Sequence, residues 1–112
     1  MAGSSKSKIS QLAKNIKRDP KDTFSKFALA LELLKADRVE KAQLLFEAIL
    51  KQDPEYLGVY YHLGKLYQSR GMYQPAMELF EEGIKLASKK NELRTKSELS
   101  EAKIQLQYEL EE

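Results

Sequence analysis

The residues able to carry out chemistry are few in this chain. His62 is the only histidine among 112 residues, and the chain has no cysteine. A metal site built from paired histidines or thiolates is therefore excluded. A lone histidine within a helical pattern is more often a partly exposed helix residue than a catalytic base. The composition predicts neither a metal site nor a cofactor.

The carboxylates and glycines also lack the arrangement that catalysis needs. Asp and Glu alternate with Lys along the expected helix faces, as on solvated surfaces, and no pair stands out for acid–base work. The glycines after residue 50 are dispersed instead of clustered in a phosphate-binding loop. They are Gly58, Gly64, Gly71 and Gly83. Because no nucleophile, base and orienting group come together, we expect no enzyme.

Length and composition favour one intracellular domain. A chain of 112 residues that is 42% hydrophobic can bury one core, so residues 1–112 are expected to form a single domain. No apolar run approaches the length that spans a bilayer, and a cysteine-free chain fits a reducing compartment. We expect a cytoplasmic protein without a membrane partner. The basic, acid-free residues 1–18 also fit an organelle transit peptide, which we consider the weaker alternative.

A spacing of 34 residues links the two halves of the chain. Asp19-Pro20 and Asp53-Pro54 are one such pair of positions, and three apolar pairs have the same offset: Ala42 and Ala76, Phe46 and Phe80, Leu50 and Ile84. Apolar residues follow helical spacing on both sides of Arg70-Gly71, which predicts a helical hairpin over residues 60–84. The offset predicts a second hairpin before it.

Turn and capping residues set the expected helix boundaries. Residues 1–6 are predicted to be disordered, and residues 7–18 form a helix with an apolar stripe at Ile9, Leu12 and Ile16. Asp19-Pro20 is expected to cap and start the next helix, while Asp37 and Glu40 form a capping-box pattern. Gly71 is expected to end a helix in the left-handed conformation. Pro75 then falls in the first turn of the next helix.

These residues resemble the tetratricopeptide repeat, whose pattern is W-x2-L-G-x2-Y, then A-x3-F, then P. The second repeat, residues 57–90, matches with Tyr60 for the tryptophan, followed by Leu63-Gly64, Tyr67, Ala76 and Phe80, while Ser88 replaces the proline. The first repeat, residues 23–56, is looser but keeps Leu29, Ala30, Ala42, Phe46 and Pro54. The resemblance implies a small stand-alone all-α protein. Its two repeats would form a right-handed solenoid of helical hairpins between capping helices at 7–18 and 91–112.

The resemblance also implies a function, because repeats of this family bind peptides or partner helices on the concave face of their first helices. We therefore expect a protein-interaction adaptor. The groove residues implied for the first repeat are Phe24, Phe27, Leu31, Leu34 and Lys35. Those implied for the second repeat are Tyr61, Lys65, Gln68 and Ser69, with His62 at the border. The amino-terminal helix could instead fold over the first set and make it core.

One subclass of the family binds acidic chaperone tails through a clamp of Lys and Asn. The matching positions here are Phe27, Leu31 and His62. This departure argues against chaperone-tail binding.

Two alternatives concern the ends of the chain. Ile104 and Tyr108 lie off the Leu99–Leu110 stripe of the closing helix, so a homodimer through that helix is the alternative function. The amino-terminal helix carries five basic residues and could contact nucleic acid, although the pattern favours a solvated face. The expected partner is another protein, whose identity the sequence does not give.

Overall fold

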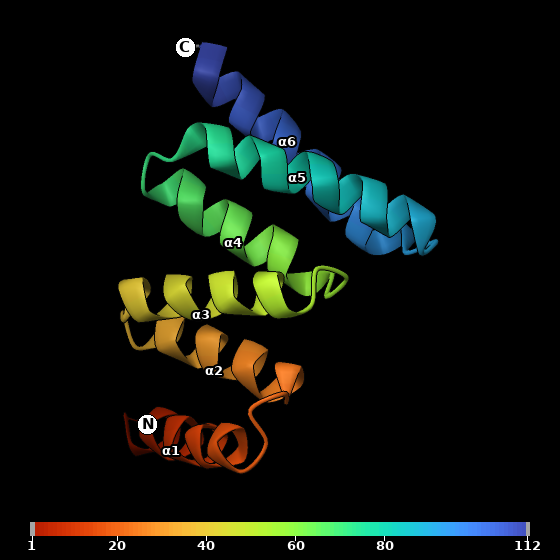
Figure 1. Ribbon diagram of the computed structural model, residues 1–112. Coiled ribbons are helices and arrows are strands. Elements are labelled where there is room, and N and C mark those ends of the chain that lie inside the picture. The colour runs from red at the N-terminus through yellow and green to blue at the C-terminus, as the bar shows by residue number, and fades with distance from the viewer. Residues whose placement is uncertain (1, 112) are drawn as a thin grey trace. The chain divides into compact units, whose positions relative to one another are not determined.

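The computed structural model describes the backbone of residues 2–111 and the side chains of residues 6–111. The described residues form helices and no strand (Figure 1). The chain divides into two compact units, Met1–Pro54 and Glu55–Glu112. Each unit contains one hairpin of antiparallel helices and one further helix packed against it. The all-α class predicted from the sequence is therefore confirmed. In the described part of the chain, no helix combines the length and apolar character needed to cross a bilayer.

The first unit contains α1 (Ala2–Arg18), α2 (Thr23–Lys35) and α3 (Val39–Gln52). The α2 and α3 helices form the hairpin, with Ala30, Ala42 and Phe46 fully buried. The α1 helix packs against α2, where Lys8 Nζ lies 3.8 Å from the Glu32 carboxylate. The helix expected from Ser7 begins at Ala2, so the disordered tail predicted for residues 1–6 is helical over 2–6, and Met1 lies outside the described residues.

The α2 helix starts later than Asp19-Pro20 predicted. Its N-cap is Asp22, whose side chain accepts hydrogen bonds from Ser25 N at 3.0 Å and from Ser25 Oγ at 2.6 Å. These two bonds hold the pKa of the Asp22 carboxyl below its usual value, because they stabilise the charged form. Asp19 instead accepts a bond from Lys21 N at 3.1 Å within the preceding turn. The choice of Asp19 as the cap was wrong.

The second unit contains α4 (Gly58–Ser69), α5 (Tyr73–Lys89) and α6 (Leu93–Glu111). The α4 and α5 helices form the hairpin, and α6 packs along α5 and also contacts α4 (Figure 1). Ala76, Phe80, Leu99 and Leu106 are fully buried between these helices. Leu110, which was expected on the same buried stripe, is 52% exposed. Figure 1 shows the last turn of α6 projecting past α5.

Three helices end in the same way. Asp37, Gly71 and Asn91 have φ angles of 60°, 77° and 58°. The residue after each donates its backbone N–H to a carbonyl five residues earlier, at 2.8 Å in all three turns. This is the Schellman geometry, in which a left-handed residue satisfies the last helix carbonyls. The prediction for Gly71 is confirmed. Asp37 has this role too and caps no helix, because the N-cap of α3 is Arg38 and no side chain caps α3.

Candidate functional site: a groove between α4 and α6

One face of α4 stays open in the second unit. Tyr61, Lys65 and Gln68 follow each other at intervals of four and three residues, so they share one side of the helix. Each of these side chains is half-buried, whereas Tyr60, Leu63 and Leu66 on the other sides are buried. One side of α4 therefore presents a partly exposed row of polar and aromatic side chains, while its other sides are buried.

The α6 helix forms the opposite wall. Two cavities, of about 260 and 280 Å³, lie between the two helices. The first is lined by Tyr61 of α4 and by Glu98, Glu101, Ala102 and Gln105 of α6. The second is lined by Lys65, Gln68 and Ser69 of α4 and by Glu109 of α6. We call this set of residues the α4–α6 groove.

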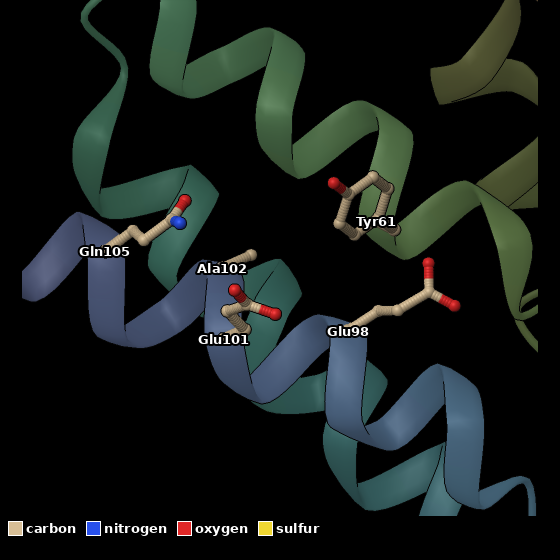
Figure 2. A pocket seen from close by; sticks show the side chains of 5 residues that line it. All are labelled: Tyr61, Glu98, Glu101, Ala102 and Gln105. Atoms are coloured by element: carbon tan, nitrogen blue, oxygen red, sulfur yellow. The ribbon is translucent and has the colours of Figure 1, made fainter.

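Figure 2 shows the first cavity from close by. The Tyr61 ring projects from α4 toward α6, and the Glu98 side chain extends from α6 toward α4. Glu101 and Gln105 lie along the same stretch of α6. An aromatic ring on one wall and carboxylates on the other give the cavity both an apolar surface and hydrogen-bond acceptors.

The second cavity contains an incompletely satisfied amide. Gln68 Nε2 donates to Glu109 Oε1 at 2.7 Å, which joins the ends of α4 and α6. Gln68 Oε1 is buried and has no hydrogen-bond partner among the described residues. The Ser69 hydroxyl donates to the Leu66 carbonyl at 2.7 Å, so its proton is already used within α4. Gln68 Oε1 is consequently a buried acceptor without a partner among the described residues of this cavity, and the Glu109 carboxylate beside it has further acceptor positions.

The His62 ring is in contact with the ring of Tyr61, its neighbour in the chain. The two rings meet edge to face, with centroids 5.4 Å apart and an interplanar angle of 89°. Burial lowers the pKa of His62 from its usual 6.5, because desolvation disfavours the charged imidazolium, and the nearby Glu98 carboxylate opposes this shift. Burial therefore favours the neutral imidazole, which lies in contact with the Tyr61 ring.

The groove residues expected in the first unit are less uniform. Phe24 is 69% exposed, so α1 does not cover it. The Phe27 ring lies 6.0 Å from the ring of the buried Phe46, which gives Phe27 a role in packing α2 on α3. Leu31 and Leu34 are half-buried. Lys35 Nζ lies 3.5 Å from the Glu32 carboxylate on its own helix.

Sequence reasoning missed the α6 wall of the groove. The predicted closing helix was assigned only an apolar stripe and an outer side of Glu and Lys. Glu98, Glu101 and Gln105 each come directly before a buried member of that stripe, at Leu99, Ala102 and Leu106. This adjacency could have indicated the α6 wall of the groove, since a residue next to a buried stripe lies at the edge of the helix interface.

Paired helices, left-handed turns and an open face on the first helix of the hairpin define a helical-hairpin repeat protein. A family model described as the tetratricopeptide repeat matches residues 33–95, and the chain belongs to this family. No curated protein sequence matches the chain significantly. No group of three or more metal-ligating side chains occurs among the residues that the structure describes.

Solved structures agree with this assignment. A tetratricopeptide repeat domain protein from Salinibacter ruber is 41% identical in its solution structure, with a TM-score of 0.74, and the match covers 79% of this chain and 89% of that one. The TPR2B domain of yeast Sti1, solved as a complex with pHsp70, has a TM-score of 0.82 at 17% identity and covers 90% and 81%. YrrB, a TPR protein with an unusual peptide-binding site, has a TM-score of 0.60 at 18% identity and covers 85% and 56%. The last two show likeness of fold.

Proposed function

We propose that this protein is an interaction adaptor that binds a peptide or helix of a partner protein in the α4–α6 groove. The carrying observation is the open face of α4, where Tyr61, Lys65 and Gln68 line two cavities while the apolar side chains of the same helix are buried. For the first unit, we propose a contact surface of its own on α2, made of Phe24, Phe27, Leu31 and Lys35. The pHsp70 complex of the Sti1 domain and the peptide-binding site of YrrB support the same use of the fold.

The size of the groove sets the expected affinity. A groove of this length buries far less than the roughly 1,600 Å² of a standard stable interface. Binding must also offset the entropy lost by the peptide. We therefore expect dissociation constants of about micromolar strength for a single partner segment.

The test is capture of partners by the tagged chain from its own cells. The groove variant is Tyr61→Ala/Gln68→Ala, and the matched control is Tyr73→Ala/Gln74→Ala, which makes the same two changes at exposed positions of α5. Circular dichroism and urea titration establish that both variants fold. We expect the groove variant to lose the partners and the control to keep them. Identical partners for the wild type and the groove variant would contradict the proposal.

A second candidate function is self-association through α6. Ile104 and Tyr108 are 52% and 67% exposed and line a shallow hollow of about 220 Å³ with Gln107 and Glu111. Exposed apolar side chains one turn apart on a helix are typical of helix–helix contacts. Light scattering tests this candidate: a dimer that Tyr108→Glu dissociates supports it, and a monomer at high concentration contradicts it.

A further inference from the structure

The α4–α6 groove has a net negative charge, opposite in sign to the chain as a whole. Its carboxylates are Glu98, Glu101 and Glu109, and its one ammonium group is Lys65, which gives 1 − 3 = −2. The whole chain has a formal net charge of +2 at pH 7. His62 adds no positive charge at pH 7, because its burial favours the neutral ring.

The carboxylates at the Tyr61 end lack a cationic partner. In the described part of the chain, no Lys or Arg side chain lies within 4.0 Å of the carboxylate of Glu98 or Glu101. By contrast, Glu81 on α5 is paired with Lys103 at 3.3 Å and Glu55 with Lys90 at 3.4 Å. Among the described residues, Glu78 and Glu82 on α5 likewise have no Lys or Arg within 4.0 Å, so what distinguishes Glu98 and Glu101 is that they line a cavity together with Tyr61.

Tyr61 adds a second reason to expect a cation there. Its ring projects into the cavity that Glu98 and Glu101 line (Figure 2). A Lys or Arg head placed on the face of a tyrosine is attracted by the ring quadrupole, and two nearby carboxylates add Coulomb attraction. An arginine also supplies several N–H donors to carboxylate oxygens in one plane.

The other end of the groove favours N–H donors as well. Gln68 Oε1 is a buried acceptor without a partner among the described residues, and Glu109 already accepts from Gln68 Nε2. A peptide N–H or a cationic side chain can satisfy the amide oxygen after a small rotation, whereas a carboxylate ligand offers no proton. The first cavity therefore favours cationic donors, and the second offers the Gln68 amide oxygen and the Glu109 carboxylate as acceptors beside the Lys65 ammonium group.

From these observations we propose that the α4–α6 groove binds an extended, basic segment of the partner protein, with a Lys or Arg head between Glu98 and Glu101 and against the Tyr61 ring. The inference rests on the proposed function and names the chemistry of its ligand. Glu98 and Glu109 are eleven residues apart on one helix, which corresponds to about 16 Å. An extended segment of roughly five residues covers that distance.

The probes are three short peptides that differ only in charge. One alternates Ala with Arg, the second has citrulline in place of each Arg, and the third has Glu. Each is added to the isotopically labelled full chain, and binding is followed by the amide shifts of α4 and α6 in two-dimensional NMR. We expect saturable shifts with the Arg peptide and binding at least about tenfold weaker with the other two. Equal binding of the Arg and citrulline peptides, or no shift in α4 and α6, overturns the inference.

Paired variants locate the cation site. Glu98→Gln/Glu101→Gln removes both charges with little change in shape, and Glu78→Gln/Glu82→Gln removes the same charge from exposed positions of α5. We expect the first variant to bind the Arg peptide about tenfold more weakly, as for the loss of two partly exposed charge pairs, and the second to bind as the wild type does. Unchanged binding by the first variant overturns the inference.

Capture of the natural partner protein by two variants distinguishes failure of this inference from failure of the proposed function. If the captured partner is lost with Tyr61→Ala/Gln68→Ala but fully retained with Glu98→Gln/Glu101→Gln, the adaptor function stands and the basic ligand is wrong. If the partner is retained by both variants while the Arg peptide still shifts the groove amides, the proposed function fails and the charge preference holds. Loss of the partner with both variants supports the two together.

Discussion

Gly64 of α4 leaves the space that the ring of Phe80 of α5 occupies. A Cβ atom added at Gly64 would lie 2.8 Å from Phe80 Cδ1, closer than side chains pack in proteins, and Phe80 is fully buried. Gly83 has a similar role, since a Cβ there would lie 2.8 Å from Tyr60 Cβ and 2.9 Å from Leu99 Cδ1. These close approaches fix how the three helices of the second unit pack, and thereby fix the two walls of the α4–α6 groove.

Gly64→Ala tests the close approach through the sign of its effect. At an exposed helix position this change stabilises by up to about 1 kcal/mol, because alanine is the better helix former. Here the added methyl group must displace a buried ring, so we expect the free energy of unfolding to fall by about 1–3 kcal/mol. Urea denaturation measures it. A variant more stable than the wild type would show that α4 and α5 are not in close contact at this position.

Phe80→Ala tests the core against a matched exposed phenylalanine. Phe80 is fully buried, and its truncation is expected to cost about 3–5 kcal/mol of unfolding free energy. Phe24 is 69% exposed, so Phe24→Ala should change stability by less than about 0.5 kcal/mol. Both variants are compared by their urea midpoints. Similar losses of stability for the two variants would contradict the finding that Phe80 is buried and Phe24 is exposed.

Gly71 tests the left-handed helix end. Its φ angle is 77°, and a Cβ atom added there would meet no other part of the protein within 4 Å, so a substitution acts through backbone strain and not through a clash. Gly71→Ala should cost about 1 kcal/mol, and Gly71→Asn should cost less because asparagine tolerates this conformation. The chain itself uses Asp37 and Asn91 in the equivalent turns. Equal thermal midpoints for the two variants would contradict the assignment.

His62 reports on the packing of α6 against α4. Its pKa is expected below 6.5 because of burial, and Glu98→Gln should lower it further by removing the carboxylate that raises it. Since the neutral ring is favoured in the folded state, stability is complete above about pH 6.5 and falls as the pH drops below that value. The single imidazole C2–H resonance gives the pKa directly by NMR titration. Glu82→Gln is the control, and a pKa that Glu98→Gln leaves unchanged or raises would be inconsistent with a Glu98 carboxylate near the ring.

The sequence predicted the fold because the repeat pattern depends on a few large and small residues. Ala76 and Phe80 matched their positions in the first repeat, and Gly71 could be assigned because glycine adopts a positive φ most easily. The prediction that Asp37 caps a helix is wrong, since aspartate suits both an N-cap and a left-handed turn. The prediction of Asp19 as the cap is wrong because proline is frequent at a helix start but does not require one, and the bonds to Ser25 make Asp22 the N-cap.

The candidate site was predicted on one wall only. Tyr61, Lys65 and Gln68 followed from their places beside matched repeat positions. Glu98, Glu101 and Glu109 did not, because helical periodicity separates a buried stripe from polar faces but does not say which polar face meets another helix. Only the packing of α6 along both α4 and α5 decides that.

The most direct test of the account is to map the partner on the protein. The segment of the captured partner that binds is synthesised and added to the labelled full chain, and amide shifts are recorded for all three helices of the second unit. We predict that the largest shifts occur at Tyr61, Lys65 and Gln68 and between Glu98 and Glu109, and that Tyr61→Ala/Gln68→Ala abolishes them. Shifts confined to α5 or to the Ile104 and Tyr108 face of α6 would contradict binding in the α4–α6 groove.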